Sequence, residues 1–104
     1  MSEDYPDFQE DLESRVEEEL EEPPWYRVLL HNDDYTTMEF VVEILQKVFH
    51  KSSTEAARIM LLVHKSGIGE CGVFTAEIAE TKVEVVHHLA KKHGFPLQCS
   101  MEVA

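Results

Sequence analysis

Two adjacent carboxylates and a distant histidine are the residues of this chain that could hold a metal ion. A small metal-dependent hydrolase using Asp33, Asp34 and His64 is therefore one interpretation, since carboxylate oxygens and imidazole nitrogens are common metal ligands. The sequence contains no HxxxH, HxH or HExxH spacing, however, and the neighbours His87 and His88 would point about 100° apart on a helix. We expect neither a metal nor another cofactor.

No residue carries the local signature of a catalytic nucleophile. The serines lack the flanking glycines of a nucleophile elbow, and Cys71 would need a base that only the fold could supply. The fragment Gly67-x-Gly69 is too short to indicate a phosphate-binding loop. We therefore predict no catalytic residue and a protein that is not an enzyme.

A binding site is the alternative, because polar loop residues and His64 could face an apolar lining. Four apolar residues occur in pairs one helical turn apart, namely Met38 with Val41 and Met60 with Val63. Taken singly, each residue also has a structural explanation: turn former, helix-dipole partner or core filler. We expect Asp34 to cap a helix, which leaves Asn32 and Asp33 free for a ligand.

The elements that position these residues can be predicted from local patterns. β-formers predict a strand over 25–31, and the Asn-Asp-Asp sequence that follows predicts a turn. Thr36 and Glu39 match a capping box, followed by a stripe of apolar residues at helical spacing. Ser52 and Glu55 match a second box, for a helix that runs to about Lys65. Gly67 occupies the position of a left-handed C-cap.

The remaining chain predicts a strand over 71–75, a helix over 80–93 and a strand over 96–103. In the last strand apolar and polar residues alternate, which is typical of an antiparallel sheet with one wet face. The order β-α-α-β-α-β predicts a single small α+β domain, in which a three-stranded antiparallel sheet packs against three helices.

The charge of −12 is concentrated at the N-terminus. Residues 1–22 hold 11 acidic residues against Arg15 alone and so carry −10 of the total. Such a segment buries too little apolar surface to offset its ordering entropy, and we predict a disordered acidic extension over 1–24 with a transient helix around Leu12–Leu20. Pro23-Pro24 marks the boundary to a core domain over 25–104. Without a basic surface, nucleic-acid binding is not expected.

The sequence predicts a cytoplasmic protein. No window approaches the roughly 18 apolar residues of a membrane span, and the first residues lack the pattern of a secretory signal. Cys71 and Cys99 are too few for a disulfide framework and lack zinc-ligand spacing. We predict two buried thiols in a reducing compartment.

Long blocks of residues 23–104 resemble the ClpS family of adaptor proteins. The resemblance rests on Pro23-Pro24, on Leu29-Leu30-His31, on the runs NDDYTTMEFV (32–41) and IMLLVH (59–64), and on GVFTAEIAETKV (72–83). Thr37 departs from the proline that is frequent in the family, and we expect it to loosen the first helical turn. ClpS adaptors serve the AAA+ unfoldase ClpA and its peptidase ClpP.

The resemblance implies a receptor for N-degrons, proteins that begin with Leu, Phe, Tyr or Trp. It assigns the α-amino group to Asn32, Asp33 and His64. The implied side-chain pocket is lined by Leu30, Met38, Val41, Met60, Val63 and Leu97, with Met38 as a gate against β-branched residues. Glu77 and Lys82 are the implied contacts for the N-terminal domain of the ClpA unfoldase, and delivery would use the N-terminal arm. Alternatives are a module that docks the unfoldase but binds no N-terminus, and solvated helix charges at Glu77 and Lys82. We expect a monomer.

Overall fold

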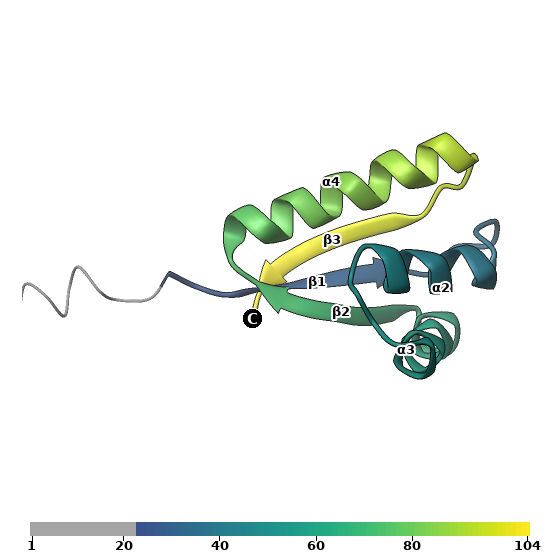
Figure 1. The fold of residues 1–104 in the computed structure, drawn as a ribbon, viewed down its shortest axis with the longest axis horizontal. Helices are drawn as coiled ribbons and strands as arrows, with labels where there is room; N and C mark the ends of the chain where they lie inside the picture. Colours follow the sequence, from purple (N-terminus) through teal and green to yellow (C-terminus); the bar gives the residue numbers. More distant parts are fainter. Residues whose placement is uncertain (1–22) are drawn as a thin grey trace, which may run out of the picture.

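The computed structural model of the protein describes residues 23–104. The prediction of a disordered extension with a transient helix around Leu12–Leu20 falls on residues outside this range. The described chain folds into six elements (Figure 1): β1 (Tyr26–His31), α2 (Met38–Lys47), α3 (Ser53–Ser66), β2 (Ile68–Phe74), α4 (Ala76–His93) and β3 (Gln98–Val103). The predicted order β-α-α-β-α-β is confirmed.

The sheet is antiparallel and has the strand order β2-β1-β3. β1 lies at the centre because its run Val28-Leu29-Leu30 is buried, whereas the outer strands are partly polar. Leu30 is paired with Gly69 on one side and Cys99 on the other. The predicted three-stranded antiparallel sheet is confirmed.

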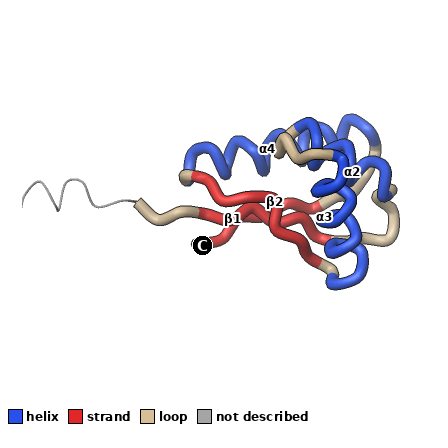
Figure 2. Tube along the Cα trace, turned by 60° about the horizontal axis from the view of Figure 1, so that its bottom comes forward, coloured by secondary structure: helices blue, strands red, loops and turns tan. Residues whose placement is uncertain are grey.

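The helices enclose the core against the sheet. Figure 2 shows α4 running above the strands, with α2 and α3 gathered at one end. The largest fully buried side chains come from both layers: Leu30, Ile44, Leu45, Ile59, Val28, Val86 and Cys71. Both thiols are free and buried, as predicted. Among helices of residues 23–104, none is long and apolar enough to cross a membrane.

The start of α2 differs from the prediction by one residue. Thr37, not Thr36, is the N-cap, and its side chain accepts a hydrogen bond of 3.1 Å from the Phe40 amide. Thr37 therefore provides an acceptor for one of the unpaired amides of the first turn. The expectation that Thr37 loosens this turn was wrong. Ser52 is confirmed as the N-cap of α3, since its hydroxyl accepts from the Glu55 amide. The Glu55 carboxylate, expected to complete the box, accepts from Arg58.

Helix α4 begins earlier than predicted, at Ala76 in place of Glu80, with Thr75 as N-cap. The buried residue of its first turns is Ala79, whose small side chain gives little hydrophobic signal. β2 also begins earlier, at Ile68, directly after Gly67 ends α3 in the left-handed conformation (φ 87°). β3 begins at Gln98, because Pro96 has no amide to donate to the sheet.

Candidate functional site

A pocket of about 220 Å³ lies between the loop after β1 and the helices α2 and α3. The structure brings seven of the predicted site residues to its wall: Asn32, Asp33, Met38, Val41, Met60, Val63 and His64. Asp34, named above only in the hydrolase alternative, and Thr36 also line the pocket, and neither was predicted as part of the binding site. Leu30 and Leu97, predicted for the side-chain pocket, lie in the hydrophobic core with exposed fractions of 0% and 2%.

The end of α3 holds the loop residue Asn32 near His64. The Asn32 amide donates a hydrogen bond of 2.9 Å to the carbonyl oxygen of Gly67, the residue that caps α3. His64 lies in the last turn of that helix, and its side chain is exposed. One backbone hydrogen bond therefore joins the loop that carries Asn32 to the end of the helix that carries His64.

The Asp33 carboxylate organises the loop. Its Oδ1 accepts hydrogen bonds from the amides of Tyr35 (2.8 Å) and Thr36 (2.7 Å), and its Oδ2 accepts from the Thr36 hydroxyl (2.6 Å). Partial burial acts to raise the pKa of Asp33, but these three bonds outweigh it and hold the pKa below its ordinary value. The carboxylate is therefore fixed in place and ionised.

The division of roles expected for the loop was wrong. Asp34 was expected to cap the helix and Asp33 to be free for a ligand. Thr37 caps α2, and Asp33 carries the hydrogen bonds of the turn. An aspartate that bonds amides two and three residues ahead is a usual turn former, and the sequence Asn-Asp-Asp left three candidates for that position.

The rest of the wall is apolar. Val41 and Val63 are buried, Met60 is half-buried, and Met38 in the first turn of α2 is 43% exposed. Because methionine is unbranched and flexible, Met38 and Met60 can adapt to side chains of different shape. The pocket is smaller than the roughly 300–1,000 Å³ of sites for drug-sized ligands, and its size suits one side chain.

The arrangement of possible metal ligands and thiols bears on the alternative functions. Within residues 23–104, no three His, Cys, Asp or Glu side chains are grouped so that they could hold a metal ion, and this includes Asp33, Asp34 and His64. Burial raises the pKa of the Cys71 thiol, with a further contribution from Cys99, and burial raises that of Cys99 to about 12. A thiol held in its protonated form is a poor nucleophile.

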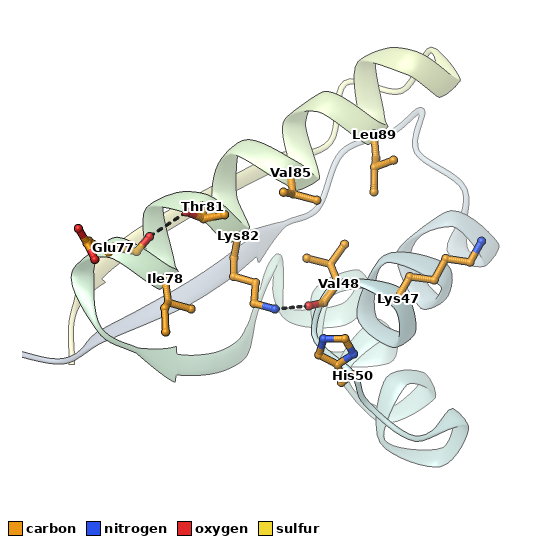
Figure 3. A pocket seen from close by; sticks show the side chains of 9 residues that line it. All are labelled: Lys47, Val48, His50, Glu77, Ile78, Thr81, Lys82, Val85 and Leu89. Atoms are coloured by element: carbon orange, nitrogen blue, oxygen red, sulfur yellow. Dashed lines mark hydrogen bonds between the residues drawn. The ribbon is translucent and has the colours of Figure 1, made fainter.

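Glu77 and Lys82 lie apart from this pocket, in a groove between α4 and the end of α2 (Figure 3). Glu77 is exposed in the first turn of α4. The Lys82 ammonium donates a hydrogen bond of 2.6 Å to the Val48 carbonyl oxygen, at the C-terminus of α2. It also lies 5.9 and 5.7 Å from the ring centroids of Phe49 and Phe74. Lys82 therefore joins α4 to α2 within the molecule, a role that the sequence did not indicate.

Comparisons with known proteins identify the family. A family model described as ATP-dependent Clp protease adaptor protein ClpS matches residues 21–100. The ClpS adapter protein of Nitratidesulfovibrio vulgaris (strain DSM 19637 / Miyazaki F) is 60% identical over 97 residues, which cover 93% of this chain and 97% of the relative. The ClpS adapter protein of Desulfatibacillum aliphaticivorans is 60% identical over 100 residues, covering 93% and 96%.

A solved structure of the same family is similar in fold. Agrobacterium tumefaciens ClpS2 bound to L-phenylalaninamide matches with a TM-score of 0.77 and 40% identity, covering 80% of this chain and 100% of that chain. The family matched is one of protease adaptors, so the protein is an adaptor and not an enzyme. The chain belongs to the ClpS family of adaptors of the ATP-dependent Clp protease.

Proposed function

We propose that the protein binds the N-terminal Leu, Phe, Tyr or Trp of substrate proteins and delivers them to the ClpA unfoldase of the cytoplasmic ClpAP protease. The observation that carries this proposal is the 220 Å³ pocket, in which a polar wall of Asn32, Asp33 and His64 faces an apolar wall. An N-terminal residue has two groups that match these walls: a charged amine for the polar wall and a side chain for the apolar wall. Both are attached to one carbon.

The ligand of the solved relative has this chemistry. L-phenylalaninamide, to which Agrobacterium tumefaciens ClpS2 is bound, has a free amine, an aromatic side chain and an amide in place of the carboxylate. It therefore resembles the first residue of a protein that begins with phenylalanine. The relation to this chain, at 40% identity, supports a ligand of the same class here.

The polar wall suits an ammonium group, whose three N–H donors need three acceptors. Asn32 can offer its side-chain carbonyl oxygen, and His64 can offer a ring nitrogen when neutral. An ionised carboxylate has about four acceptor positions, and three of those on Asp33 are used by the loop. One position remains for a charge-assisted bond to the ammonium.

The apolar wall would select the side chain. Leu, Phe, Tyr and Trp bury large apolar surface in such a pocket, and Met38 and Met60 can adjust to both branched and planar shapes. As the exposed residue at the first turn of α2, Met38 would disfavour Ile and Val, whose branched carbon lies next to the backbone.

Docking on the unfoldase would use a different surface. Glu77 is exposed and suits contact with a cationic group of the ClpA N-terminal domain. The ammonium of Lys82 is bonded to Val48, so a contact by Lys82 would have to share or replace that bond. We expect a monomeric adaptor, with residues 1–24 serving as the arm used for delivery.

Fluorescence anisotropy of labelled peptides that differ only at the first residue tests the pocket. We expect dissociation constants at or below the micromolar range, about −8 kcal/mol, for Leu, Phe and Trp peptides. Ile and Ala peptides serve as matched controls and are expected to bind much more weakly. Equal binding of the whole series would contradict side-chain selection.

A separate measurement tests docking. Glu77→Lys reverses the charge at the exposed end of α4, and we expect it to reduce capture of the isolated ClpA N-terminal domain without changing peptide affinity. If the protein bound the unfoldase but no peptide of the series, a docking module without N-degron binding would be the better account.

A further inference from the structure

A long groove on the molecule has no partner among the described residues. Its larger hollow, of about 580 Å³, lies between α4 and the end of α2, and a second hollow of about 220 Å³ adjoins it at Lys47 and Leu89. Ile78 and Val85 line the first hollow (Figure 3). Their side chains are 49% and 39% exposed. We call these two hollows together the α2–α4 groove. Its lining combines apolar residues with charged ones, and the Lys82 side chain reaches across it from α4 to the Val48 carbonyl oxygen.

The charges of the groove favour an acidic occupant. Lys47, Lys82 and Lys92 line it against Glu43 and Glu77, which leaves an excess of one positive charge. Two histidines at the same walls, His50 and His93, add positive charge when protonated.

Residues 8–20 of the same chain have matching chemistry. Apolar residues recur at every fourth position, as Phe8, Leu12, Val16 and Leu20. On a helix this spacing places all four on one face. The segment also contains six acidic residues and one basic residue, Arg15, so its net charge is −5. A helix formed here would present an apolar stripe edged by carboxylates.

The point at which the N-terminal segment joins the fold, and the length of a helix over residues 8–20, also match the groove. Tyr26, the first residue of β1, is paired with Phe74, and α4 begins two residues later at Ala76. The preceding chain therefore leaves the fold beside the Ile78 end of the groove (Figure 1). From Phe8 to Leu20 a helix extends about 18 Å, and from Ile78 to Leu89 α4 extends about 17 Å, at 1.5 Å per residue.

We propose that residues 8–20 dock as an amphipathic helix in the α2–α4 groove of their own chain, antiparallel to α4. Composition predicts that this segment is disordered by itself, but burial of its stripe on Ile78, Val85 and Leu89 offsets part of the ordering cost. The short linker gives an effective concentration in the millimolar range, so a weak contact is sufficient. This inference does not depend on the proposed N-degron binding. Because Glu77 and Lys82 line the same groove, the docked segment would compete with the proposed unfoldase contact there.

Methyl NMR of the full chain tests the contact with a matched pair of substitutions. Val16→Glu introduces a charge at the centre of the stripe, and Ser14→Glu introduces the same charge on the opposite face of the helix. We expect Val16→Glu and a deletion of residues 2–20 to shift the methyl signals of Ile78, Val85 and Leu89 in the same direction. Ser14→Glu is expected to leave them unchanged, and the signal of the core residue Ile59 reports that the fold is intact in each variant.

The dependence of these methyl shifts on protein concentration distinguishes docking within one chain from a contact between two copies. Docking within one chain predicts that the shifts do not depend on protein concentration. Groove signals that are identical in the full chain and in the deletion variant would overturn the proposal and leave the groove to another protein. Shifts that disappear on dilution would overturn it in favour of a contact between two copies.

Discussion

Asp33→Asn is the substitution that most sharply separates ligand binding from loop structure. The Asp33 carboxylate accepts three hydrogen bonds from Tyr35 and Thr36 and, in our proposal, a fourth from the ligand's ammonium. Asparagine keeps one carbonyl oxygen for the two amides, and the Thr36 hydroxyl can rotate to accept from the new NH₂ group. The substitution therefore removes the charge while most of the turn can persist.

The magnitudes follow from these contacts. A hydrogen bond to a charged group contributes about 1.5–3 kcal/mol, so loss of the carboxylate is expected to weaken peptide binding about 10- to 150-fold. The loop bonds are partly exposed, and we expect the free energy of unfolding to fall by only about 1 kcal/mol. Asp33→Ala removes all three loop bonds and is expected to cost about 2–3 kcal/mol of stability.

Thr36→Val is the matched control, because it removes one loop bond and keeps the carboxylate. We expect peptide affinity to change less than threefold, measured by anisotropy with a Phe peptide beside a thermal unfolding curve. The pKa of Asp33, followed by NMR of its carboxyl carbon, is expected to rise toward its ordinary value of 3.8. Because the native pKa is lowered, the stabilising effect of this carboxylate is present above that ordinary value and is lost as the pH falls through the lowered pKa.

The reasoning would be refuted by either of two results. If Asp33→Asn bound the Phe peptide within twofold of the native protein, the carboxylate would not be an ammonium acceptor. If Thr36→Val, which keeps the carboxylate, weakened binding as much as Asp33→Asn, the charge of Asp33 would not be needed to explain the effect of Asp33→Asn.

Three further predictions concern other contacts of the site and the fold. His64→Ala removes one of the three acceptors for the ammonium, so peptide affinity is expected to fall about tenfold. An unchanged dissociation constant in anisotropy would exclude His64 from the site. Met38→Ala is expected to reduce the preference for Leu over Ile peptides. An unchanged ratio of their dissociation constants, measured by anisotropy, would contradict the role of Met38 as a gate. Lys82→Met removes a charged hydrogen bond to Val48 and is expected to lower Tm by about 4–8 °C, for a loss of about 1 kcal/mol. Lys47→Met, which removes only the exposed pair with Glu43, is expected to change Tm by less than 2 °C, and an equal effect of the two would contradict the structural role of Lys82.

Much of the fold could be predicted because local signals agreed with the packing. Ser52 and Gly67 bracket α3 as its N-cap and its left-handed C-cap, since both positions have strong residue preferences that depend on the backbone alone. The start of α4 could not be predicted in the same way. Its buried residue Ala79 is apolar but small, and only the contact with the sheet reveals that it faces the core.

The part of the site that depends on secondary structure could be predicted. The hydrogen bonds for which several neighbouring side chains compete could not. Helical spacing placed Met38 with Val41 and Met60 with Val63, and the structure brings both pairs to one pocket. Local patterns could not decide which carboxylate of the loop would hold the turn, because Asp33 and Asp34 both have the required chemistry. The bond between Lys82 and Val48 joins residues 34 positions apart, and no local pattern records such a contact.

The central claim is that the pocket recognises a free N-terminus, and N-acetylation of one peptide tests it most directly. Acetylation removes the charge and leaves the side chain unchanged, so it isolates the contribution of Asn32, Asp33 and His64. With calorimetry of a Phe peptide and its acetylated form, we predict that acetylation weakens binding at least 100-fold, about 3 kcal/mol. Equal affinity of the two forms would contradict the assignment of the polar wall to the α-amino group.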